Sequence, residues 1–452
     1  MGITHERATQ DDVRDILHFM ATGFDRERLL GPRQVVTVLM TMIREQCGYE
    51  RGLALVHEHH GDAFGWSTKK RRGRRARRTP PSASALCRAR QNLIPEEMLE
   101  MYRSALASPV ATSARMRWLW KQHRLLAADG VRYLLPATQP IIDEWGRPKV
   151  AGGEVYQPQL LQVTIWDVGA VQPISWVEVP CLGKGFGERS TILRLLDSMQ
   201  PGDVLLLDRG FPSRRLLHEL VARGIHFVIR MMASGTKDFA EVTTFLAGRA
   251  TDAEADFAYH DPDASEPLVE RLRLVRRIDA DGSTRVLVTD LRDRDVYTRD
   301  DLFEVYRRRW GIENAFRDLK IRYEAENFHG TTPQFIKQEL ITLMLLMLME
   351  SMVEETAILA LPSAERPGGD DVRPKRHNRA ALGDRLPTLI AIALRTRVPK
   401  AMRLAFARGM AAILWSRVQV RRPRSYPRVC KSQYGRWRFE RKAKGAEILA
   451  AA

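Results

Sequence analysis

The sequence predicts an α/β fold, in which a domain of alternating strands and helices lies between an all-helical N-terminal region and a helical, basic C-terminal region. Three observations predict it. Residues 1 to about 115 carry apolar residues at helical spacing and show no strand pattern. From about residue 122, apolar runs of strand length alternate with amphipathic segments. The chain has 452 residues and a hydrophobic fraction of 44%, enough for about two to four domains with buried cores.

The N-terminal region, residues 1–118, is expected to be helical because segments 12–20, 32–46 and 95–106 each carry apolar residues at the helical period. Between these helices lies a basic arm, residues 69–78, with Lys or Arg at eight of its ten positions. A segment of this composition cannot fold alone, and we expect it to become ordered on a phosphate backbone. A solvated loop without a specific role remains the alternative.

The middle of the chain alternates strands and helices. Strands are predicted at 125–129, 160–168, 173–179, 203–208 and 226–231, and helices at 188–199 and 213–223. Three strands, a helix, a strand, a helix and a strand is the element order of an RNase H-like domain. We expect this domain to comprise residues 119–234 and 300–361. A β-rich insertion is expected at residues 235–299, with its clearest strands at 268–278 and 284–291.

A segment after the insertion combines charged and apolar side chains at helical spacing. On a single helix, four side chains would fall on one stripe: Tyr306, Arg309, Glu313 and Lys320. Three apolar residues would form the neighbouring stripe: Val305, Ile312 and Leu319. The apolar stripe is expected to pack on a core. Taken alone, the charged stripe is more typical of the solvated face of an amphipathic helix than of a functional site.

Two further segments complete the chain. Pro333 begins an apolar segment that is most simply a core helix. Residues 362–452 are expected to form a linker, a helix and a basic tail, in which residues 417–444 carry eleven Lys or Arg against one acidic residue. This tail can stack on bases and bind phosphates, or it is a disordered basic end.

The formal net charge of +17 indicates a polyanionic partner, with nucleic acid ahead of an anionic membrane surface. The membrane alternative is weak, because no apolar run approaches the ~20 residues that span a bilayer. The first twelve residues lack the apolar core of a signal peptide. The four cysteines are scattered and form no CxxC pair. We therefore expect a reduced, cytoplasmic protein that binds DNA.

Two aspartates, Asp129 and Asp208, are predicted to end apolar strands. Each also has an ordinary explanation, since Asp-Gly is a common turn and an Asp before a helix is a common N-cap. In an RNase H-like sheet, however, the first and fourth strands are parallel neighbours, which would place these carboxylates side by side. Glu313 is then the candidate for a third carboxylate, from a helix lying against the sheet.

Three clustered carboxylates disfavour one another's ionised forms unless cations neutralise them. Oxygen ligands favour Mg²⁺ or Mn²⁺, and two such ions can activate an attacking oxygen and stabilise a leaving oxygen at a phosphodiester. Arg309 and Lys320 would hold neighbouring phosphates. The sequence therefore predicts a two-metal phosphoryl-transfer site at Asp129, Asp208 and Glu313.

These motifs resemble the DDE transposases of bacterial insertion sequences, in the branch with the Tyr-Arg-Glu-Lys (YREK) signature. The resemblance covers roughly residues 120–350 and lies in LLAADG, LLLDRGF and the spacing Y-x2-R-x3-E-x6-K. It implies that water cuts the element's end to expose a 3′-hydroxyl, which then attacks target DNA without a covalent enzyme intermediate. It also implies that Asp129, Asp208 and Glu313 bind the metal ions.

The resemblance further implies partners. The three basic or phenolic signature residues would contact the non-transferred strand: Tyr306, Arg309 and Lys320. The N-terminal helices would recognise the terminal inverted repeat of double-stranded DNA, and a homodimer would bridge two ends in a synaptic complex at the bacterial nucleoid. The arm is expected to contribute further DNA contacts: Lys69, Lys70, Arg71, Arg72, Arg74 and Arg75. A silent DNA-binding relative, or a nuclease of the same fold that joins nothing, remains possible.

One feature departs from the family pattern. Some relatives use a tryptophan in the insertion to accept a flipped base during hairpin formation, whereas residues 211–305 contain no Trp. Tyr259, Phe257 or Tyr297 would have to substitute, or the ends would be resolved without a hairpin.

Two other constellations have simpler interpretations. His57, Glu58, His59 and His60 suggest metal binding, but consecutive helical residues do not share a face, so an exposed polar patch is favoured. The glycines at 183, 185 and 187 do not match a dinucleotide-binding fingerprint and are expected in a loop before the helix that begins at Glu188.

Overall fold

A computed structural model describes residues 30–361 with short gaps, and a few isolated positions beyond. The gaps are residues 62–63, 65, 67–79, 151–152, 182, 184, 234–237, 262–264, 280 and 360. The predicted helix at 12–20, the basic arm at 69–78 and most of the chain after residue 361 lie outside the described residues. Contacts divide the chain into a unit Met1–Val418 and a unit Gln419–Ala452.

The N-terminal region is helical wherever it is described. Its helices are α2 (Pro32–Glu45), α3 (Tyr49–His60), α4 (Ala83–Asn92), α5 (Pro95–Leu106) and α6 (Pro109–Arg117). Pro95 occupies the first turn of α5, where a missing N–H costs nothing. Ser82 and Ser108 cap α4 and α6 by accepting hydrogen bonds from backbone N–H groups three residues on. The predictions at 32–46 and 95–106 are therefore confirmed.

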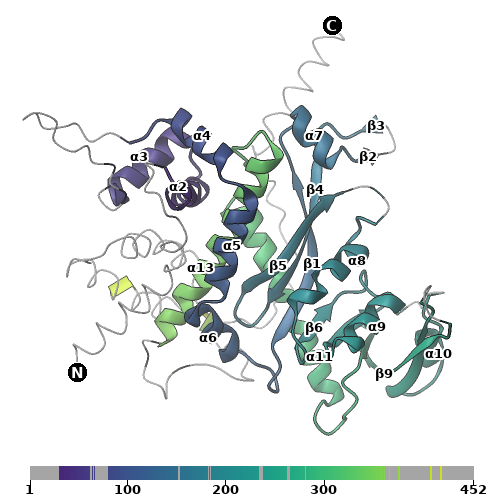
Figure 1. Cartoon of the computed structure of the whole chain (residues 1–452). Coiled ribbons are helices and arrows are strands. Elements are labelled where there is room, and N and C mark those ends of the chain that lie inside the picture. Colours follow the sequence, from purple (N-terminus) through teal and green to yellow (C-terminus); the bar gives the residue numbers. More distant parts are fainter. Residues whose placement is uncertain are drawn as a thin grey trace, which may run out of the picture. The chain divides into compact units, whose positions relative to one another are not determined.

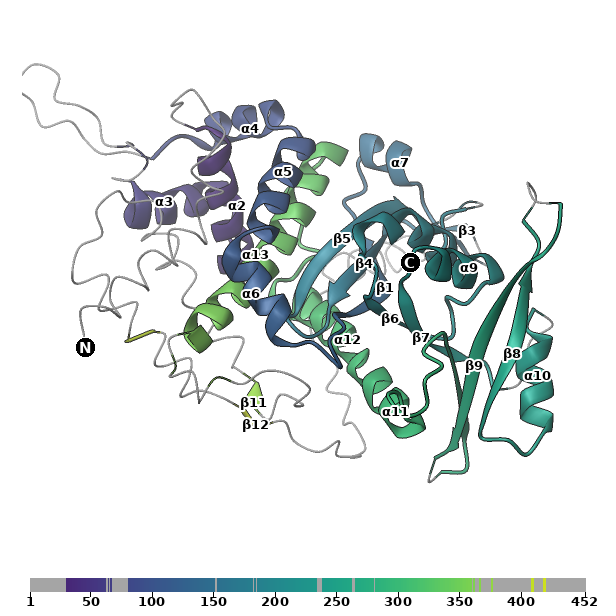
Figure 2. The ribbon, with the colours of Figure 1, turned by 60° about the horizontal axis from the view of Figure 1, so that its bottom comes forward.

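An eight-stranded sheet follows, in the order β5-β4-β1-β6-β7-β10-β9-β8 (Figures 1 and 2). The first five strands of this sheet, in chain order, are β1 (Leu125–Leu134), β4 (Gln159–Asp167), β5 (Gln172–Pro180), β6 (Val204–Leu207) and β7 (His226–Met231). Strands β1, β6 and β7 are parallel, whereas β4 and β5 are antiparallel to their neighbours. The prediction that the first and fourth predicted strands, 125–129 and 203–208, are parallel neighbours is confirmed by the β1–β6 pairing.

The segment predicted as an insertion extends this same sheet. It contains α10 (Ala240–Ala247), β8 (Asp252–Tyr259), β9 (Leu268–Ile278) and β10 (Thr284–Thr289). Strand β10 pairs antiparallel with β7, so it covers an edge that would otherwise expose unpaired N–H and C=O groups. Strands β9 and β10 match the predicted ones. Strand β8, DAEADFAY, was missed because its polar residues give little strand pattern.

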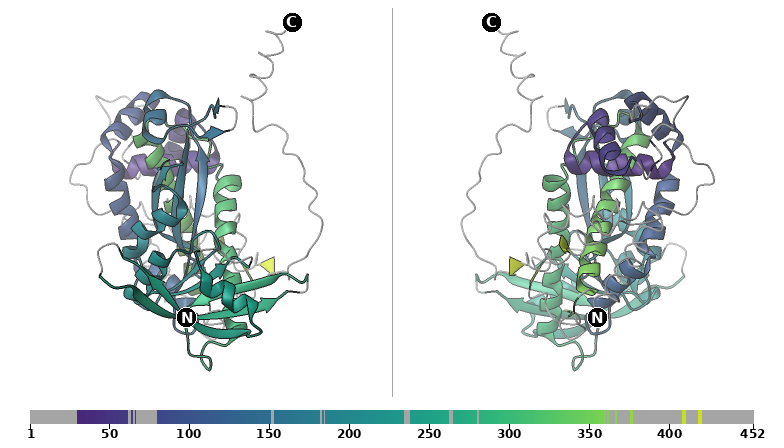
Figure 3. Two further views of the ribbon diagram at one scale, coloured as in Figure 1. Left: turned by 90° about the vertical axis from the view of Figure 1, so that its right-hand side faces the viewer. Right: turned by 90° about the vertical axis from the view of Figure 1, so that its left-hand side faces the viewer.

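Helices cover both faces of the sheet. Alternate residues of β1 enter two different cores: Leu125 and Ala127 pack with α13 (Pro333–Leu359), whereas Leu126 and Ala128 face α9 (Arg214–Ala222). Helix α13 is buried almost all round because it lies between the sheet and the N-terminal helices (Figures 1 and 3). The prediction that Pro333 begins a core helix is confirmed.

The predicted helix from Tyr306 to Lys320 is interrupted, so that prediction was wrong in detail. Helix α11 (Arg299–Arg308) meets α12 (Trp310–Arg317) at Arg309, and a π-helical turn, Asp318–Arg322, follows. The Ile312 N–H bonds to the Arg309 carbonyl three residues back, which tightens the chain locally. The apolar stripe of Val305, Ile312 and Leu319 is nevertheless fully buried.

Shorter elements join these parts. The predicted helix at 188–199 is one α-helical turn, α8 (Glu188–Thr191), continued by a 3₁₀ helix, Ile192–Ser198. The remaining elements are α7 (Gln139–Trp145), β2 (Lys149–Val150), β3 (Gly153–Glu154), β11 (Lys375–Arg376) and β12 (Val418–Gln419). Within the described residues, no helix is long and apolar enough to cross a membrane.

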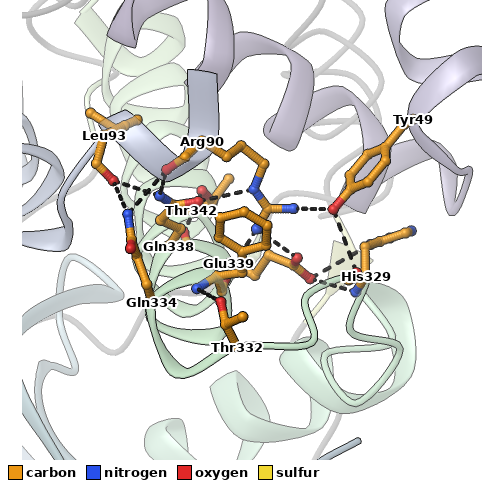
Figure 4. Close-up of polar contacts among 10 residues, drawn as sticks. Tyr49, Arg90, Leu93, His329, Thr332, Gln334, Gln338, Glu339 and Thr342 are labelled. Carbon is orange, nitrogen blue, oxygen red and sulfur yellow. Dashed lines mark hydrogen bonds and ion pairs between the residues drawn. The ribbon is translucent and has the colours of Figure 1, made fainter. Parts of the chain in front are cut away.

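A buried polar cluster joins the N-terminal helices to α13 (Figure 4). Arg90 on α4 is completely buried and forms an ion pair with Glu339 on α13, with 2.9 Å between Nη2 and Oε1. The same guanidinium donates to the Gln338 side chain and to the Tyr49 hydroxyl. The backbone N–H of His329 donates to the second carboxylate oxygen of Glu339 at 2.9 Å. These contacts fix α3 and α4 against the helix that supports the sheet.

Candidate active site

Asp129 lies on β1, and Asp208 directly follows β6, the parallel neighbour of β1. The pairing of β1 with β6 runs from Leu125↔Val204 to Ala127↔Leu206. Two residues further in the same register, Asp129 is opposite Asp208, at the carboxyl end of β6. The sequence prediction that Asp129 ends its strand was wrong, because β1 continues to Leu134 through its pairing with β4.

The ordinary explanations for these aspartates do not hold. Asp129 and Gly130 lie inside β1 and so form no turn. Helix α9 is capped by Ser213, whose side chain accepts from the Leu216 N–H, so Asp208 is not its N-cap. Asp208 instead accepts a hydrogen bond from the Gly210 N–H at 2.7 Å. Asp129 is therefore not part of an Asp-Gly turn, and Asp208 is not a helix N-cap.

Glu313 is linked to Asp129 by the guanidinium of Arg309, which contacts both carboxylates. The Arg309 guanidinium lies 2.6 Å from Glu313 Oε1 through Nη2 and 3.7 Å from Asp129 Oδ2 through Nη1. Its side chain is only 11% exposed. Burial alone would lower the pKa of Arg309, but Tyr306, Glu313 and Asp129 act in the opposite direction and raise it. Arg309 thus serves as an internal cation between two of the predicted acids.

Tyr306 belongs to the same cluster. Its ring lies 6.0 Å from the Arg309 guanidinium carbon, and the side chain is buried. Burial raises the pKa of Tyr306, while the nearby Arg309 and Arg230 lower it and Asp208 raises it. The phenol is therefore neutral at ordinary pH and close to both Asp208 and Arg309.

The Lys320 side chain contacts Arg132 and Glu326 rather than the two aspartates. Its Nζ donates to the Arg132 carbonyl at 2.7 Å and lies 3.3 Å from Glu326 Oε1. Arg132 is three residues beyond Asp129 on β1, so Lys320 is held farther along that strand. The structure brings Tyr306, Arg309 and Glu313 to the two aspartates, but it does not bring Lys320 into contact with them.

The pKa of Asp129 is raised, chiefly by burial. Burial raises the pKa of Asp129 to about 7, and Glu188 and Asp208 act in the same direction. The hydrogen bond from the Gly130 N–H, at 2.9 Å, and the charge of Arg309 oppose this shift. A divalent cation would relieve the repulsion.

The donor set fits Mg²⁺ or Mn²⁺, because every candidate ligand is a carboxylate oxygen. In the described part of the chain, no group of three His, Cys, Asp or Glu side chains is already arranged around one point as metal ligands. The Glu313 carboxylate is bound to the Arg309 guanidinium. Asp129 and Asp208 would hold a metal ion, and Glu313 would join them once Arg309 releases it.

Sequence reasoning missed a fourth carboxylate, Glu188 at the start of α8. A Cβ atom on Gly130 would lie only 2.2 Å from Glu188 Oε1. Burial raises the pKa of Glu188, and the charge of Asp208 raises it further. The one sequence signal was the glycine that directly follows Asp129, because glycine permits such a close approach.

The aromatic candidates in the extended edge of the sheet occupy different environments. Phe257 is only 2% exposed and packs on Phe239, so the idea that it accepts a base was wrong. The Tyr297 hydroxyl lies 2.7 Å from His123 Nε2. Because His123 precedes β1, Tyr297 lies at the amino-terminal ends of the parallel strands rather than at their carboxyl ends. Tyr259 is half-buried and stacks on His218.

The histidines of α3 and the glycine before α8 lie in different environments. Glu58 and His59 are exposed on α3, as expected for a polar patch. His60 is only 3% exposed, so the patch prediction was wrong for that residue. Gly187 directly precedes α8, in agreement with the predicted loop before Glu188.

Comparison with known proteins identifies the class: this chain is a DDE transposase. Residues 122–349 match the family model described as the transposase DDE domain, and they make up just over half of the 452 residues. The chain belongs to this family. No curated protein matches the sequence.

Solved structures give a more distant comparison. One similar structure is the cryo-EM structure of a piggyBac transposase synaptic complex with hairpin DNA. The two chains are 11% identical, the similarity covers 87% of this chain and 76% of that chain, and the TM-score is 0.42.

Proposed function

We propose that this transposase cleaves DNA at the ends of a bacterial insertion sequence and joins the exposed 3′-hydroxyl to target DNA. The chemistry would take place in an RNase H-like domain, residues 119–234 and 300–361, at Asp129, Asp208 and Glu313. One observation carries the proposal. The β1–β6 register sets Asp129 beside Asp208, and Arg309 ties Asp129 to Glu313.

The side chains of this site have distinct tasks in the proposal. Asp129 and Asp208 supply oxygen ligands from adjacent strands, and Glu313 supplies one from α12. Bound Mg²⁺ or Mn²⁺, in two sites, supplies activation of the attacking oxygen and stabilisation of the leaving oxygen. Arg309 exchanges its carboxylate partners for a phosphate, which its planar fork can bind through two hydrogen bonds.

The spacing of Tyr306, Arg309, Glu313 and Lys320 supports assignment of the protein to the YREK branch. We assign Tyr306, Arg309 and Lys320 contacts with the non-transferred strand. The neutral Tyr306 phenol can donate a hydrogen bond to a phosphate oxygen. Lys320 would bind the backbone farther along β1, because its ammonium group lies at Arg132.

The partners in this proposal are double-stranded DNA, both terminal inverted repeats and target, and a second copy of the chain. Residues 1–118 would bind the inverted repeat, and residues 69–78 its phosphates. Two ends have to be cut and joined together, which a homodimer in a synaptic complex would achieve. The net charge of +17 supports a nucleic-acid partner.

A joining assay tests the proposal. The purified full chain is incubated with a duplex of the inverted repeat that flanks its gene, supercoiled plasmid and Mg²⁺ or Mn²⁺, and joined product is separated on a gel. Asp129→Asn, Asp208→Asn and Glu313→Gln should each reduce joining by at least about a thousandfold, since each removes a charged metal ligand. Asp300→Asn is the control, because Asp300 is an exposed acid on α11.

The outcomes separate the alternatives. Joining that persists in the three variants would contradict the assigned site. Cleavage without joining by the wild-type protein would favour a nuclease of the same fold. Tight end binding without any chemistry would favour a silent DNA-binding relative.

A further inference from the structure

Glu188 approaches the predicted metal site from the opposite face of the sheet. We propose that Glu188 is a fourth carboxylate ligand of this site, which binds the metal ion held by Asp129 and Asp208. The inference rests on the proposed function, because it adds a ligand to the same site. It assigns a role to α8, which lies outside the three motifs that carry the family resemblance.

The backbone directions explain how two faces of a sheet can serve one site. Side chains alternate along a strand, so Asp129 points to the same side as Ala127 and Val131, toward α12 and α13. Residue 130 points to the other side, toward α8 and α9. Asp208 follows Val204 and Leu206 in this alternation and shares the face of Asp129. Glu188 therefore comes from the face opposite to the one that Ala127 and Val131 line, and it approaches Asp129 at the neighbouring residue, Gly130.

Gly130 makes this approach possible. A Cβ atom on residue 130 would lie 2.2 Å from Glu188 Oε1 and 2.7 Å from both Cγ and Cδ. The Glu188 side chain therefore fills the space that any other residue type would occupy. Its carboxylate is held against the backbone of the residue next to Asp129.

The Asp129 carboxylate turns toward the same residue. Its Oδ1 accepts a hydrogen bond from the Gly130 N–H at 2.9 Å. Glu188 and Asp129 thus both place carboxylate oxygens against Gly130, and carboxylates that lie close together are stabilised by a bound cation.

A simpler role for Glu188 has to be distinguished. An acid in the first turn of a helix interacts favourably with the helix dipole, and Arg132 lies close enough to lower the pKa of Glu188. Neither contact requires a metal ion. The two roles differ in what metal titration measures, because a dipole or arginine partner has little effect on metal affinity.

Binding of Mn²⁺ to the full chain without DNA tests the inference directly. MnCl₂ is titrated into the protein and free Mn²⁺ is measured by electron paramagnetic resonance. Glu188→Gln, which keeps the size of the side chain, should weaken Mn²⁺ binding about tenfold or more. Glu188→Asp should also weaken it, because the shorter side chain keeps the charge but does not reach. Glu96→Gln, an exposed first-turn acid of α5, should leave binding unchanged.

A second variant guards against an uninformative loss of folding. Gly130→Ala introduces the Cβ atom that displaces the Glu188 carboxylate, while it changes none of the candidate ligand residues themselves. It should weaken Mn²⁺ binding to a similar extent as Glu188→Gln. Thermal unfolding of each variant checks that the fold is retained.

The results separate this inference from the proposed function. Wild-type affinity in Glu188→Gln, or full recovery in Glu188→Asp, would overturn the role of Glu188 as a ligand. If Asp129→Asn weakened Mn²⁺ binding in the same experiment, the proposed function would still stand. Lack of saturable binding by the wild-type protein would contradict the metal site itself and this inference with it.

Discussion

At the scale of single residues, Arg309 holds the central position in the site. Its guanidinium contacts both Asp129 and Glu313, so the DNA-free protein carries its own counterion where metal ions are expected. A metal ion and this side chain compete for the same carboxylates. DNA would resolve the competition by offering Arg309 a phosphate instead.

This competition gives a prediction for Arg309→Gln. Removing one positive charge a few ångströms from two carboxylates should tighten Mn²⁺ binding to the DNA-free protein by about tenfold, since such a charge contributes more than ~1 kcal/mol at an effective dielectric constant of ~20. The same change should weaken binding of the end duplex. Arg307→Gln serves as the control, because Arg307 is an exposed neighbour on α11. Weaker Mn²⁺ binding in Arg309→Gln would show that Arg309 orders the ligands rather than competing for them.

A second prediction for single residues concerns His226, the first residue of β7, and its partner Asp290. His226 Nδ1 lies 2.6 Å from Asp290 Oδ2, and this hydrogen bond raises the pKa of His226 above its usual 6.5, although burial opposes the shift. A raised pKa in the folded state stabilises the protein below the unfolded value, and this stabilisation is lost as pH rises through the folded value.

The test compares wild-type protein with Asp290→Asn by urea unfolding at several pH values. The difference in unfolding free energy should be larger at about pH 6 than at about pH 8.5, because His226 is charged in the first case. An equal difference at both pH values would mean that the pair contributes only its neutral hydrogen bonds.

At the scale of elements, the contact of α4 with α13 couples the N-terminal helices to the sheet. Arg90 and Glu339 are buried, 0% and 3% exposed, and Arg90 also holds Gln338 and Tyr49 (Figure 4). A buried ion pair contributes little net stability, but the loss of one partner leaves an unpaired charge in the core. The orientation of α3 and α4 therefore depends on both residues being present.

The prediction is that Arg90→Ala lowers the free energy of unfolding by about 3–5 kcal/mol. The paired replacement Arg90→Met with Glu339→Leu should recover most of this loss, because no charge is then left unpaired. Chemical denaturation of the three proteins measures both effects. A double variant as unstable as Arg90→Ala would indicate that the other hydrogen bonds of the cluster carry the stability.

Another element-scale observation is that the strands of residues 235–299 lengthen the main sheet. Strand β10 pairs with β7, and Arg273 of β9 is buried while its guanidinium pairs with Asp252 of β8 at 2.6 Å. The segment is thus joined to the sheet by backbone hydrogen bonds between β10 and β7.

At the scale of the whole molecule, the charge of +17 is expected to govern DNA binding. Each phosphate neutralised by Lys or Arg contributes about 0.9 to the slope of log affinity against log salt concentration. Replacing the basic residues of 69–78 by Gln or Ser should therefore weaken end binding and flatten the slope. Fluorescence anisotropy of a labelled end duplex at several salt concentrations measures it. An unchanged slope would remove the arm from the interface.

Periodic patterns made much of the fold predictable. Strands β7 and β9 were located at their observed bounds, and the apolar stripe of Val305, Ile312 and Leu319 was correctly assigned to a core. Such patterns arise from local geometry, because the period of a helix or strand decides which neighbours share a face. The break at Arg309 leaves no such trace, since a tightened turn changes hydrogen bonds rather than residue types.

The sequence by itself determined which residues are candidates for chemistry: two acids at apolar strands, and Tyr306, Arg309, Glu313 and Lys320 at their spacing. Only the tertiary structure decided which of them meet. The β1–β6 register set Asp129 beside Asp208, Arg309 joined Asp129 to Glu313, and Gly130 admitted Glu188 from the other face. The physical reason is that contacts between distant segments depend on strand register and on the face of the sheet to which each side chain points. The local periodicity of the sequence does not encode how distant strands are aligned.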